Sequence, residues 1–174
     1  MSKANLGKTV LLLLFLAGAV FFAFYQRPQR GIGPGDEAPD FTLPAVGGGS
    51  LALHDFRHRV VVLNFWATWC LPCVEEIPSL QKFADQTRNS GVVVIGVSED
   101  QNRGSLEKFT AEHHLSYPVA HDSNQSVAAR YGTFKYPETF ILGRDGRVAR
   151  KIAGPVDWQN PHLLGAVQVL ARGK

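Results

Sequence analysis

The feature that most constrains this chain is a Cys-x-x-Cys pair, Cys70 and Cys73, where the sequence changes from strand-like to helix-like. Ahead of it, residues 60–63 form an apolar, β-branched run that is typical of a buried strand. After Cys73, apolar residues recur every three or four positions, as on one face of a helix. Because the free N–H groups at a helix N-terminus stabilise an anion, this position favours the thiolate of Cys70.

Two other interpretations of the cysteine pair are weaker. A zinc site needs about four ligands, whereas the chain has two cysteines in total and its six histidines are scattered. A purely structural disulfide across so short a loop would constrain the unfolded chain little. A Cys-x-x-Cys beside a βαβ pattern is instead typical of a redox-active dithiol. We therefore expect thiol–disulfide exchange, with no metal and no cofactor besides the Cys70–Cys73 disulfide itself.

Residues 64–73, Asn-Phe-Trp-Ala-Thr-Trp-Cys-Leu-Pro-Cys, resemble the active-site segment of the TlpA/ResA/DsbE group of membrane-anchored, extracytoplasmic thioredoxin-like proteins. The resemblance covers most of residues 35–172. It implies an α/β, thioredoxin-like fold with an N-terminal β-hairpin and a central βα insertion, preceded by one transmembrane helix.

The same resemblance implies roles for the residues around the cysteines. Cytoplasmic thioredoxin has a buried aspartate where this chain has Asn64, and in the TlpA/ResA/DsbE group an acidic residue three positions after the second cysteine takes part instead. That residue is Glu76 here. We expect Cys70 to attack a substrate disulfide and Cys73 to resolve the mixed disulfide. Glu76 would oppose thiolate formation or exchange a proton with Cys73.

A second matching segment is Tyr136-Pro137-Glu138-Thr139-Phe140. Thioredoxin-like folds carry a cis-proline facing the Cys-x-x-Cys, and Pro137 stands at that place; an ordinary turn proline is the alternative. Only X-Pro bonds adopt cis at modest cost, and the backbone before Pro137 could pair with a substrate strand. In DsbE-type proteins the glutamate after this proline contributes to an acidic active-site surface, a role expected here of Glu138 and Glu76. The predicted substrate-binding residues are Trp69, Tyr136, Pro137 and Glu138.

The N-terminal segment predicts a membrane anchor. Residues 10–25 are an unbroken apolar run with basic and no acidic flanks, near the lower length limit of a spanning helix. An A-x-A-like site at residues 17–19 would permit cleavage, but cutting there leaves an apolar stub, which favours an uncleaved signal-anchor. Lys3 and Lys8 then keep the N-terminus cytoplasmic and the domain periplasmic. The predicted organisation is an anchor at 1–26, a linker at 27–35 and a thioredoxin-like domain at 36–174.

The net charge of +3 comes from this segment. Without the four basic residues among the first thirty, 14 Lys and Arg face 15 Asp and Glu. The globular part therefore shows no sign of nucleic-acid binding.

The rest of the chain supplies the remaining elements. His54 and His58 are four positions apart but lie in a predicted loop, which argues against a metal site, and His113 and His114 are predicted to be exposed. We expect short strands at 41–43 and 51–53, a strand at 92–97, a helix capped by Ser105, a helix at 126–131, strands at 139–142 and 147–152, and a final helix at 157–172.

The resemblance implies a reductase. In an oxidising compartment a reductase depends on imported electrons, so the expected donor is a DsbD/CcdA-type transmembrane protein. The expected substrates are disulfide-bearing exported proteins, with apocytochrome c first.

Three alternatives stay open: a general periplasmic reductase, isomerase or oxidase; a peroxiredoxin-like peroxidase, whose cysteine would lie in a different motif; and a Sco-like copper chaperone. The Sco type needs a wider cysteine spacing and a distal histidine, for which His113, His114 and His121 have no supporting motif.

Overall fold

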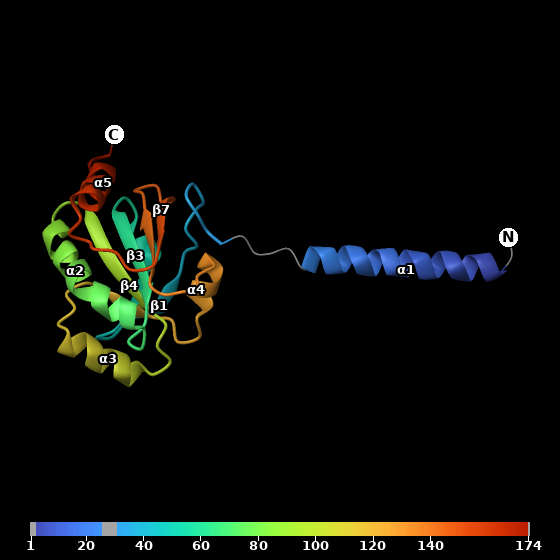
Figure 1. The fold of residues 1–174 in the computed structure, drawn as a ribbon, viewed down its shortest axis with the longest axis horizontal. Coiled ribbons are helices and arrows are strands. Elements are labelled where there is room, and N and C mark those ends of the chain that lie inside the picture. Colours follow the sequence, from blue (N-terminus) through green and yellow to red (C-terminus); the bar gives the residue numbers. More distant parts are fainter. Residues whose placement is uncertain (1–2, 26–30, 174) are drawn as a thin grey trace. The chain divides into compact units, whose positions relative to one another are not determined.

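The computed structural model describes residues 3–25 and 31–173, which fall in two units, residues 1–30 and 31–174. The first unit contains a single helix, α1 (Lys3–Tyr25) (Figure 1). Among the described residues, no helix combines the length and hydropathy needed to cross a bilayer. The transmembrane anchor at 1–26 thus stays a prediction, and residues 1–2 and 26–30 lie outside the described part.

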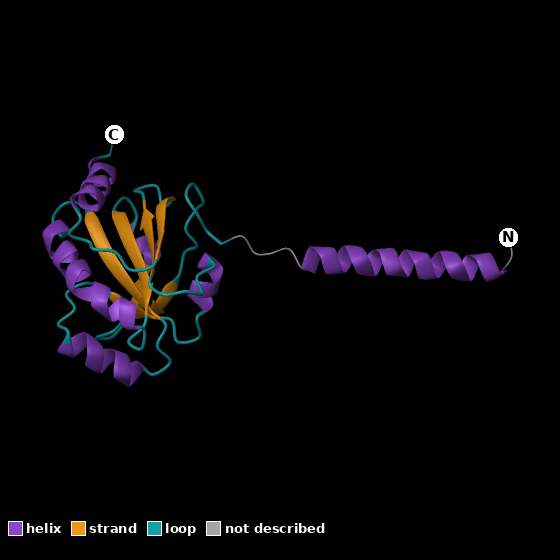
Figure 2. Cartoon of the chain, viewed as in Figure 1, coloured by secondary structure: helices purple, strands orange, loops and turns teal. Residues whose placement is uncertain are grey.

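The second unit is built on a five-stranded sheet with strand order β5-β4-β3-β6-β7 (Figures 1 and 2). β3, β4 and β5 run parallel, whereas β6 and β7 are antiparallel to their neighbours. The elements are β1 (Thr42–Pro44), β2 (Ser50–Ala52), η1 (Leu53–Phe56), β3 (Val60–Trp66), α2 (Leu71–Thr87), β4 (Val92–Ser98), α3 (Arg103–Glu112), β5 (Val119–His121), α4 (Ser126–Tyr131), β6 (Glu138–Leu142), β7 (Val148–Ala153) and α5 (Pro161–Arg172).

The central strand β3 is buried along its whole length because both faces of the sheet are covered. Successive side chains point to opposite faces. Val60 and Val62 pack with α2, α3 and α5, whereas Val61 and Leu63 pack with α4, η1 and the β1–β2 hairpin. A strand that is buried on both faces has a nearly continuous apolar sequence. The apolar run at residues 60–63 predicted β3 for this reason.

The predicted thioredoxin-like architecture is confirmed, including the hairpin of β1 and β2 and the βα insertion in which α3 leads to edge strand β5. Part of the segment predicted as a linker, residues 32–35, is hydrogen-bonded to the domain. Ile32 and Gly35 are hydrogen-bonded through their N–H groups to the carbonyls of Tyr131 and Val148. Gly132 has φ 67°, and a Cβ there would lie 2.5 Å from the Gly31 Cα, so this contact requires glycine.

Two predicted helix starts were wrong. α3 is capped by Asn102, whose side-chain oxygen accepts the Ser105 N–H at 2.9 Å, so Ser105 lies inside the first turn. α5 begins at Pro161 and not at residue 157, because the Asn160 side chain caps it and proline suits the first helical position. The preceding residues form a turn that leaves Trp158 free to enter the core.

Candidate active site

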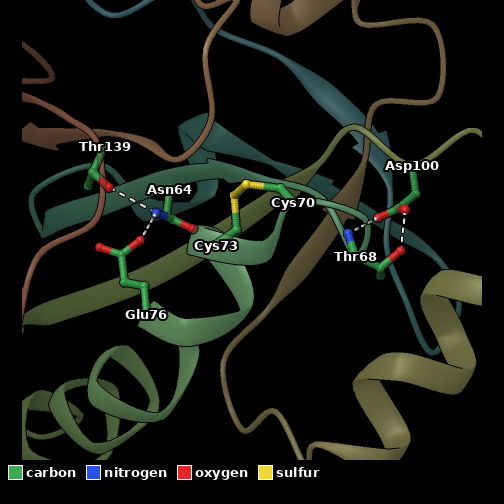
Figure 3. Close-up of a disulfide and its surroundings, with 7 residues drawn as sticks. All are labelled: Asn64, Thr68, Cys70, Cys73, Glu76, Asp100 and Thr139. Carbon is green, nitrogen blue, oxygen red and sulfur yellow. Dashed lines mark hydrogen bonds between the residues drawn. A yellow bond between two sulfur atoms is a disulfide. The ribbon is translucent and has the colours of Figure 1, made fainter.

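Cys70 and Cys73 form a disulfide at the start of α2 (Figure 3). Cys70 is the N-cap residue, and its carbonyl accepts the Val74 N–H at 3.1 Å. Cys73 lies in the first turn, and it is 2% exposed against 7% for Cys70. This placement matches the predicted one, with Cys70 nearer to solvent and to the positive end of the helix dipole.

The segment leading to Cys70 is fixed by a buried aspartate from the end of β4. Asp100 accepts the Thr68 N–H at 3.0 Å and the Thr68 hydroxyl at 2.6 Å. The Ser98 hydroxyl also donates to it, at 2.8 Å. Figure 3 shows this pair on the Cys70 side of the disulfide. Our sequence interpretation missed Asp100; the available signal was its position directly beyond a buried parallel strand, next to the end of β3.

The Cys73 side of the disulfide holds a buried polar group centred on Glu76 (Figure 3). The Trp158 indole N–H donates to one Glu76 oxygen at 2.8 Å, and the Val156 N–H donates to the same oxygen at 3.2 Å. The Asn64 amide donates to the other oxygen at 3.4 Å and to the Thr139 hydroxyl at 2.9 Å. Asn64 thus bridges α2 and β6 beneath the disulfide.

Burial raises the pKa of Glu76 above its ordinary value, and the hydrogen bonds from Trp158, Val156 and Asn64 act in the opposite direction. Glu76 therefore holds a proton over a wider pH range than an exposed glutamate. Its neighbour Glu75 is exposed.

The loop before β6 contains the predicted cis bond, between Tyr136 and Pro137. We call residues 133–137 the cis-proline loop. The Tyr136 ring meets the Trp69 ring edge-to-face with centroids 6.0 Å apart, which places this loop beside the residue that precedes Cys70. Trp69 is 63% exposed, and Leu71 and Phe134 are also exposed. Exposed apolar side chains, Trp69 and Leu71, thus stand on both sides of Cys70 in the sequence.

Glu138 does not form the expected acidic surface. Its side chain is buried, with one oxygen 3.1 Å from the Lys151 Nζ and the other accepting the Thr133 hydroxyl at 2.5 Å. Glu76 is buried as well. Both carboxyls lie inside the fold: Glu138 is on β6, which pairs with the central strand β3, and Glu76 is on the buried face of α2. The prediction that they line an acidic surface was therefore wrong.

The histidines lie apart from the disulfide or are engaged elsewhere. His54 Nδ1 lies 2.9 Å from an Asp40 oxygen, and His58 follows η1 with φ 67°. His113 and His114 are exposed, as predicted. His121 is buried, with its Nε2 2.7 Å from the Asp100 carbonyl oxygen. Within residues 3–25 and 31–173, no group of three His, Cys, Asp or Glu side chains is arranged to hold a metal.

A further buried carboxyl, Glu99, follows β4 and was not singled out from the sequence. Its backbone N–H donates to the Trp66 carbonyl at 2.9 Å, and its side chain is fully buried. Burial, with the nearby Asp122 and Asp100 carboxylates, raises the pKa of Glu99 to about 9, against an opposing interaction with Tyr136.

This shift predicts that Glu99 makes stability pH-dependent. Its pKa is raised from 4.5 in the unfolded chain to about 9, so its stabilising contribution is complete below pH 4.5 and is lost as the pH rises to about 9. Compared with Glu99→Gln, the wild-type chain should lose up to about 1.4 kcal/mol of unfolding free energy per pH unit in this window. Urea unfolding of the wild-type chain and Glu99→Gln at pH 5 and pH 8 measures this difference. If both proteins lost the same unfolding free energy between the two pH values, burial would not raise the pKa of Glu99.

Comparison with known proteins agrees with this geometry. The AhpC/TSA family profile matches residues 34–151. The chain is 34% identical over 157 residues to the thiol-disulfide oxidoreductase ResA of Bacillus cereus, which covers 88% of this chain and 91% of the relative. The chain belongs to the AhpC/TSA family. Within it, the chain is a thioredoxin-like protein of the TlpA/ResA/DsbE group.

Solved structures support the same assignment. A crystal structure of a candidate DsbE-type thiol:disulfide interchange protein from Chlorobium tepidum is 30% identical, with a TM-score of 0.76 over 81% of this chain and 99% of the other. A secreted thiol-disulfide isomerase from Corynebacterium glutamicum is 26% identical, with a TM-score of 0.70 over 84% and 95%. With Cys70 and Cys73 joined at the helix start, this AhpC/TSA protein is a thiol-disulfide oxidoreductase.

Proposed function

We propose that this protein is an extracytoplasmic disulfide reductase whose main substrate is apocytochrome c. The observation that carries the proposal is the Cys70–Cys73 disulfide at a helix N-terminus, beside a cis-proline loop and an exposed tryptophan. The relatives, a thiol-disulfide oxidoreductase named ResA and a thiol:disulfide interchange protein named DsbE, support thiol–disulfide exchange. The resemblance of residues 64–73 to the TlpA/ResA/DsbE group favours its reductive direction. The Pro-Glu-Thr-Phe segment at residues 137–140, which resembles that of DsbE-type cytochrome c maturation proteins, favours apocytochrome c.

In the proposed reaction the reduced enzyme starts with the Cys70 thiolate and the Cys73 thiol. The Cys70 sulfur attacks one sulfur of the substrate disulfide; a new S–S bond forms, the old one breaks, and the substrate's other sulfur leaves as a thiolate. Cys73 then loses its proton and attacks the Cys70 sulfur, which releases the second substrate sulfur. The substrate has gained two electrons, and the enzyme holds the Cys70–Cys73 disulfide.

Glu76 is the proposed proton acceptor for Cys73. It lies on the Cys73 side of the disulfide, three positions further along α2, and is shielded from solvent. A buried carboxylate there takes the thiol proton more readily than an exposed one because burial raises its pKa. The proton returns when the disulfide is reduced again.

Substrate docking is assigned to the cis-proline loop and Trp69. An extended substrate segment can pair with the backbone ahead of Pro137, which supplies main-chain hydrogen bonds. Trp69 offers a rigid, exposed aromatic surface one residue from the attacking sulfur. Substrate disulfides flanked by apolar residues therefore fit this surface best.

The proposed setting is the outer side of the cytoplasmic membrane. Residues 1–26 would anchor the chain as an uncleaved signal-anchor, and a DsbD/CcdA-type transmembrane protein would return electrons to Cys70 and Cys73. The arrangement is consistent with the need for imported electrons where the surroundings are oxidising.

Replacing Cys73 by serine should trap the substrate, because no second thiol remains to release it. We expect full-length Cys73→Ser, expressed in its native host, to accumulate covalent adducts on Cys70 that mass spectrometry identifies as apocytochromes c. The Cys70→Ser/Cys73→Ser variant is the matched control and should carry none.

Other outcomes separate the alternatives. A broad collection of exported proteins on Cys70 would replace the apocytochrome proposal with a general reductase or isomerase, the latter being the activity named for the Corynebacterium glutamicum neighbour. Exchange through Cys70 would be contradicted if the Cys70→Ser/Cys73→Ser control also carried adducts. It would equally be contradicted if Cys73→Ser carried no adducts in the presence of a reduced electron donor.

A further inference from the structure

Glu138 directly follows the cis-proline, yet the exchange reaction described above does not use it. The residue is 8% exposed, and two partners hold its side chain. The Lys151 Nζ lies 3.1 Å from one carboxyl oxygen, and the Thr133 hydroxyl donates to the other oxygen at 2.5 Å. Both oxygens of Glu138 are therefore satisfied inside the fold, one by a cation and one by a hydroxyl.

The hydrogen bond between Thr133 and Glu138 spans the cis-proline loop. Thr133 is the first residue of this loop, and Glu138 is the first residue after it. The end of the loop is also held by the Gly154 N–H, which donates to the Pro137 carbonyl at 2.9 Å. Among the described residues, the backbone N–H groups at 134–136 have no backbone partner. The conformation of the loop therefore depends on how its two ends are joined.

Lys151 reaches Glu138 from the neighbouring strand β7. It lies opposite Phe140 in the β6–β7 pairing, so Lys151 and Glu138 are diagonal neighbours on one face of the sheet. The Lys151 ammonium also lies 4.9 Å from the centroid of the Phe140 ring, which attracts a cation. Within the part of the chain that the structure describes, no other cation is paired with Glu138. Lys151 thus supplies the counter-charge that a carboxylate inside the fold needs.

We propose that Lys151 is a positioning residue for substrate docking: its ammonium keeps the Glu138 carboxylate bonded to Thr133 and so fixes the cis-proline loop. The proposal rests on the docking role assigned to that loop. Without the ammonium, the carboxylate would be buried and uncompensated, which is costly. The backbone of Glu138 is held between β3 and β7. Its side chain therefore turns toward solvent and releases the Thr133 hydroxyl, and a substrate segment must order the loop before it can pair with it.

The test compares two disulfides reduced by the full-length, pre-reduced chain. DTNB is small and reports the reactivity of the thiols, whereas insulin is a polypeptide that must dock. The ratio of their second-order rate constants, insulin over DTNB, therefore isolates docking. Lys151→Met keeps a flexible apolar side chain and removes the charge. Its ratio should fall about tenfold below that of the wild-type chain, since contacting residues are coupled by about twofold to 100-fold.

Three further variants show whether the charge and the bonded hydroxyl are responsible. Lys151→Arg keeps a cation beside Glu138 and should restore the ratio. Arg150→Met is the matched control, because it removes a cation from the adjacent, exposed position of β7, and its ratio should equal that of the wild-type chain. Thr133→Val keeps the Lys151–Glu138 pair but lacks the hydroxyl, so its ratio should be low.

A second background separates the charge of Lys151 from its packing. Glu138→Gln carries no charge, and its amide oxygen can still accept the Thr133 hydroxyl. In this background Lys151→Met should not lower the ratio further, because no carboxylate remains to be compensated. A contribution that came only from packing of the Lys151 side chain on Phe140 would lower the ratio equally in both backgrounds.

The positioning role of Lys151 would be overturned by equal ratios in Lys151→Met and Arg150→Met, or by a wild-type ratio in Thr133→Val. A tenfold fall that persists in the Glu138→Gln background would overturn it as well. These results would leave the docking role of the loop in place. A wild-type chain that reduces DTNB but no insulin would instead overturn the docking of polypeptides at this loop, and the inference with it.

Discussion

Replacing Glu76 by glutamine is expected to slow the second half of the reaction, the release of substrate by Cys73, by about 10²–10⁴-fold. Glutamine has nearly the same shape, and its oxygen can still accept the Trp158 and Val156 N–H groups that hold Glu76. It cannot take a proton from the Cys73 thiol. In the wild-type chain, the release rate should also rise with pH through a pKa above 4.5, since burial raises the pKa of Glu76.

The measurement is the lifetime of the mixed disulfide after acid quenching, with pre-reduced protein and insulin. Glu75→Gln is the matched control, because it removes an adjacent but exposed carboxylate from the same helix turn. Its mixed disulfide should decay at the wild-type rate, whereas that of Glu76→Gln should accumulate. Equal lifetimes in the two variants would show that another base serves Cys73.

Replacing Trp158 by alanine is expected to cost about 3–5 kcal/mol of unfolding free energy. The ring is fully buried between α2 and α5 and lies 5.1 Å from the Phe83 ring, centroid to centroid. Its indole N–H also donates the shortest of the hydrogen bonds that the Glu76 carboxyl accepts. The truncation therefore leaves a cavity and removes a donor from a buried carboxyl.

Trp158→Phe separates these two effects, because it keeps an aromatic ring and removes the N–H. We expect it to cost about 1.5–3 kcal/mol, the range for a hydrogen bond to a charged group, and to raise the pKa of Glu76 further. Urea unfolding gives the free energies, and the pH profile of substrate release gives the pKa. A Trp158→Ala chain as stable as the wild type would contradict the packing seen here.

The sequence alone predicted the parts of the site that local patterns encode. The change from a strand pattern to a helix pattern around residues 60–77 located the cysteines correctly. The spacing of apolar residues and the presence of β-branched residues indicate which side chains of a single helix or strand are buried. The cis bond at Pro137 was predicted from the resemblance of the segment around it and is present. The start of α5 was misplaced, although Asn160 before Pro161 is a recognisable helix start.

Contacts between distant segments explain the remainder. Trp158 meets Glu76 across 82 positions, and Asp100 meets Thr68 across 32. No local pattern reports such a pairing. The prediction of an acidic surface was wrong for the same reason. Charged residues are usually exposed in folded proteins, and the burial of Glu76 and Glu138 depends on which distant elements cover them.

The most direct test of the central claim is a single turnover of the pre-reduced, full-length chain with excess insulin, followed by mass spectrometry of the enzyme. Exchange through the two cysteines predicts that each chain reduces one disulfide, loses two hydrogen atoms, and yields a peptide in which Cys70 and Cys73 are joined. Insulin reduction that leaves both cysteines as free thiols, or that proceeds equally in Cys70→Ser, would contradict it.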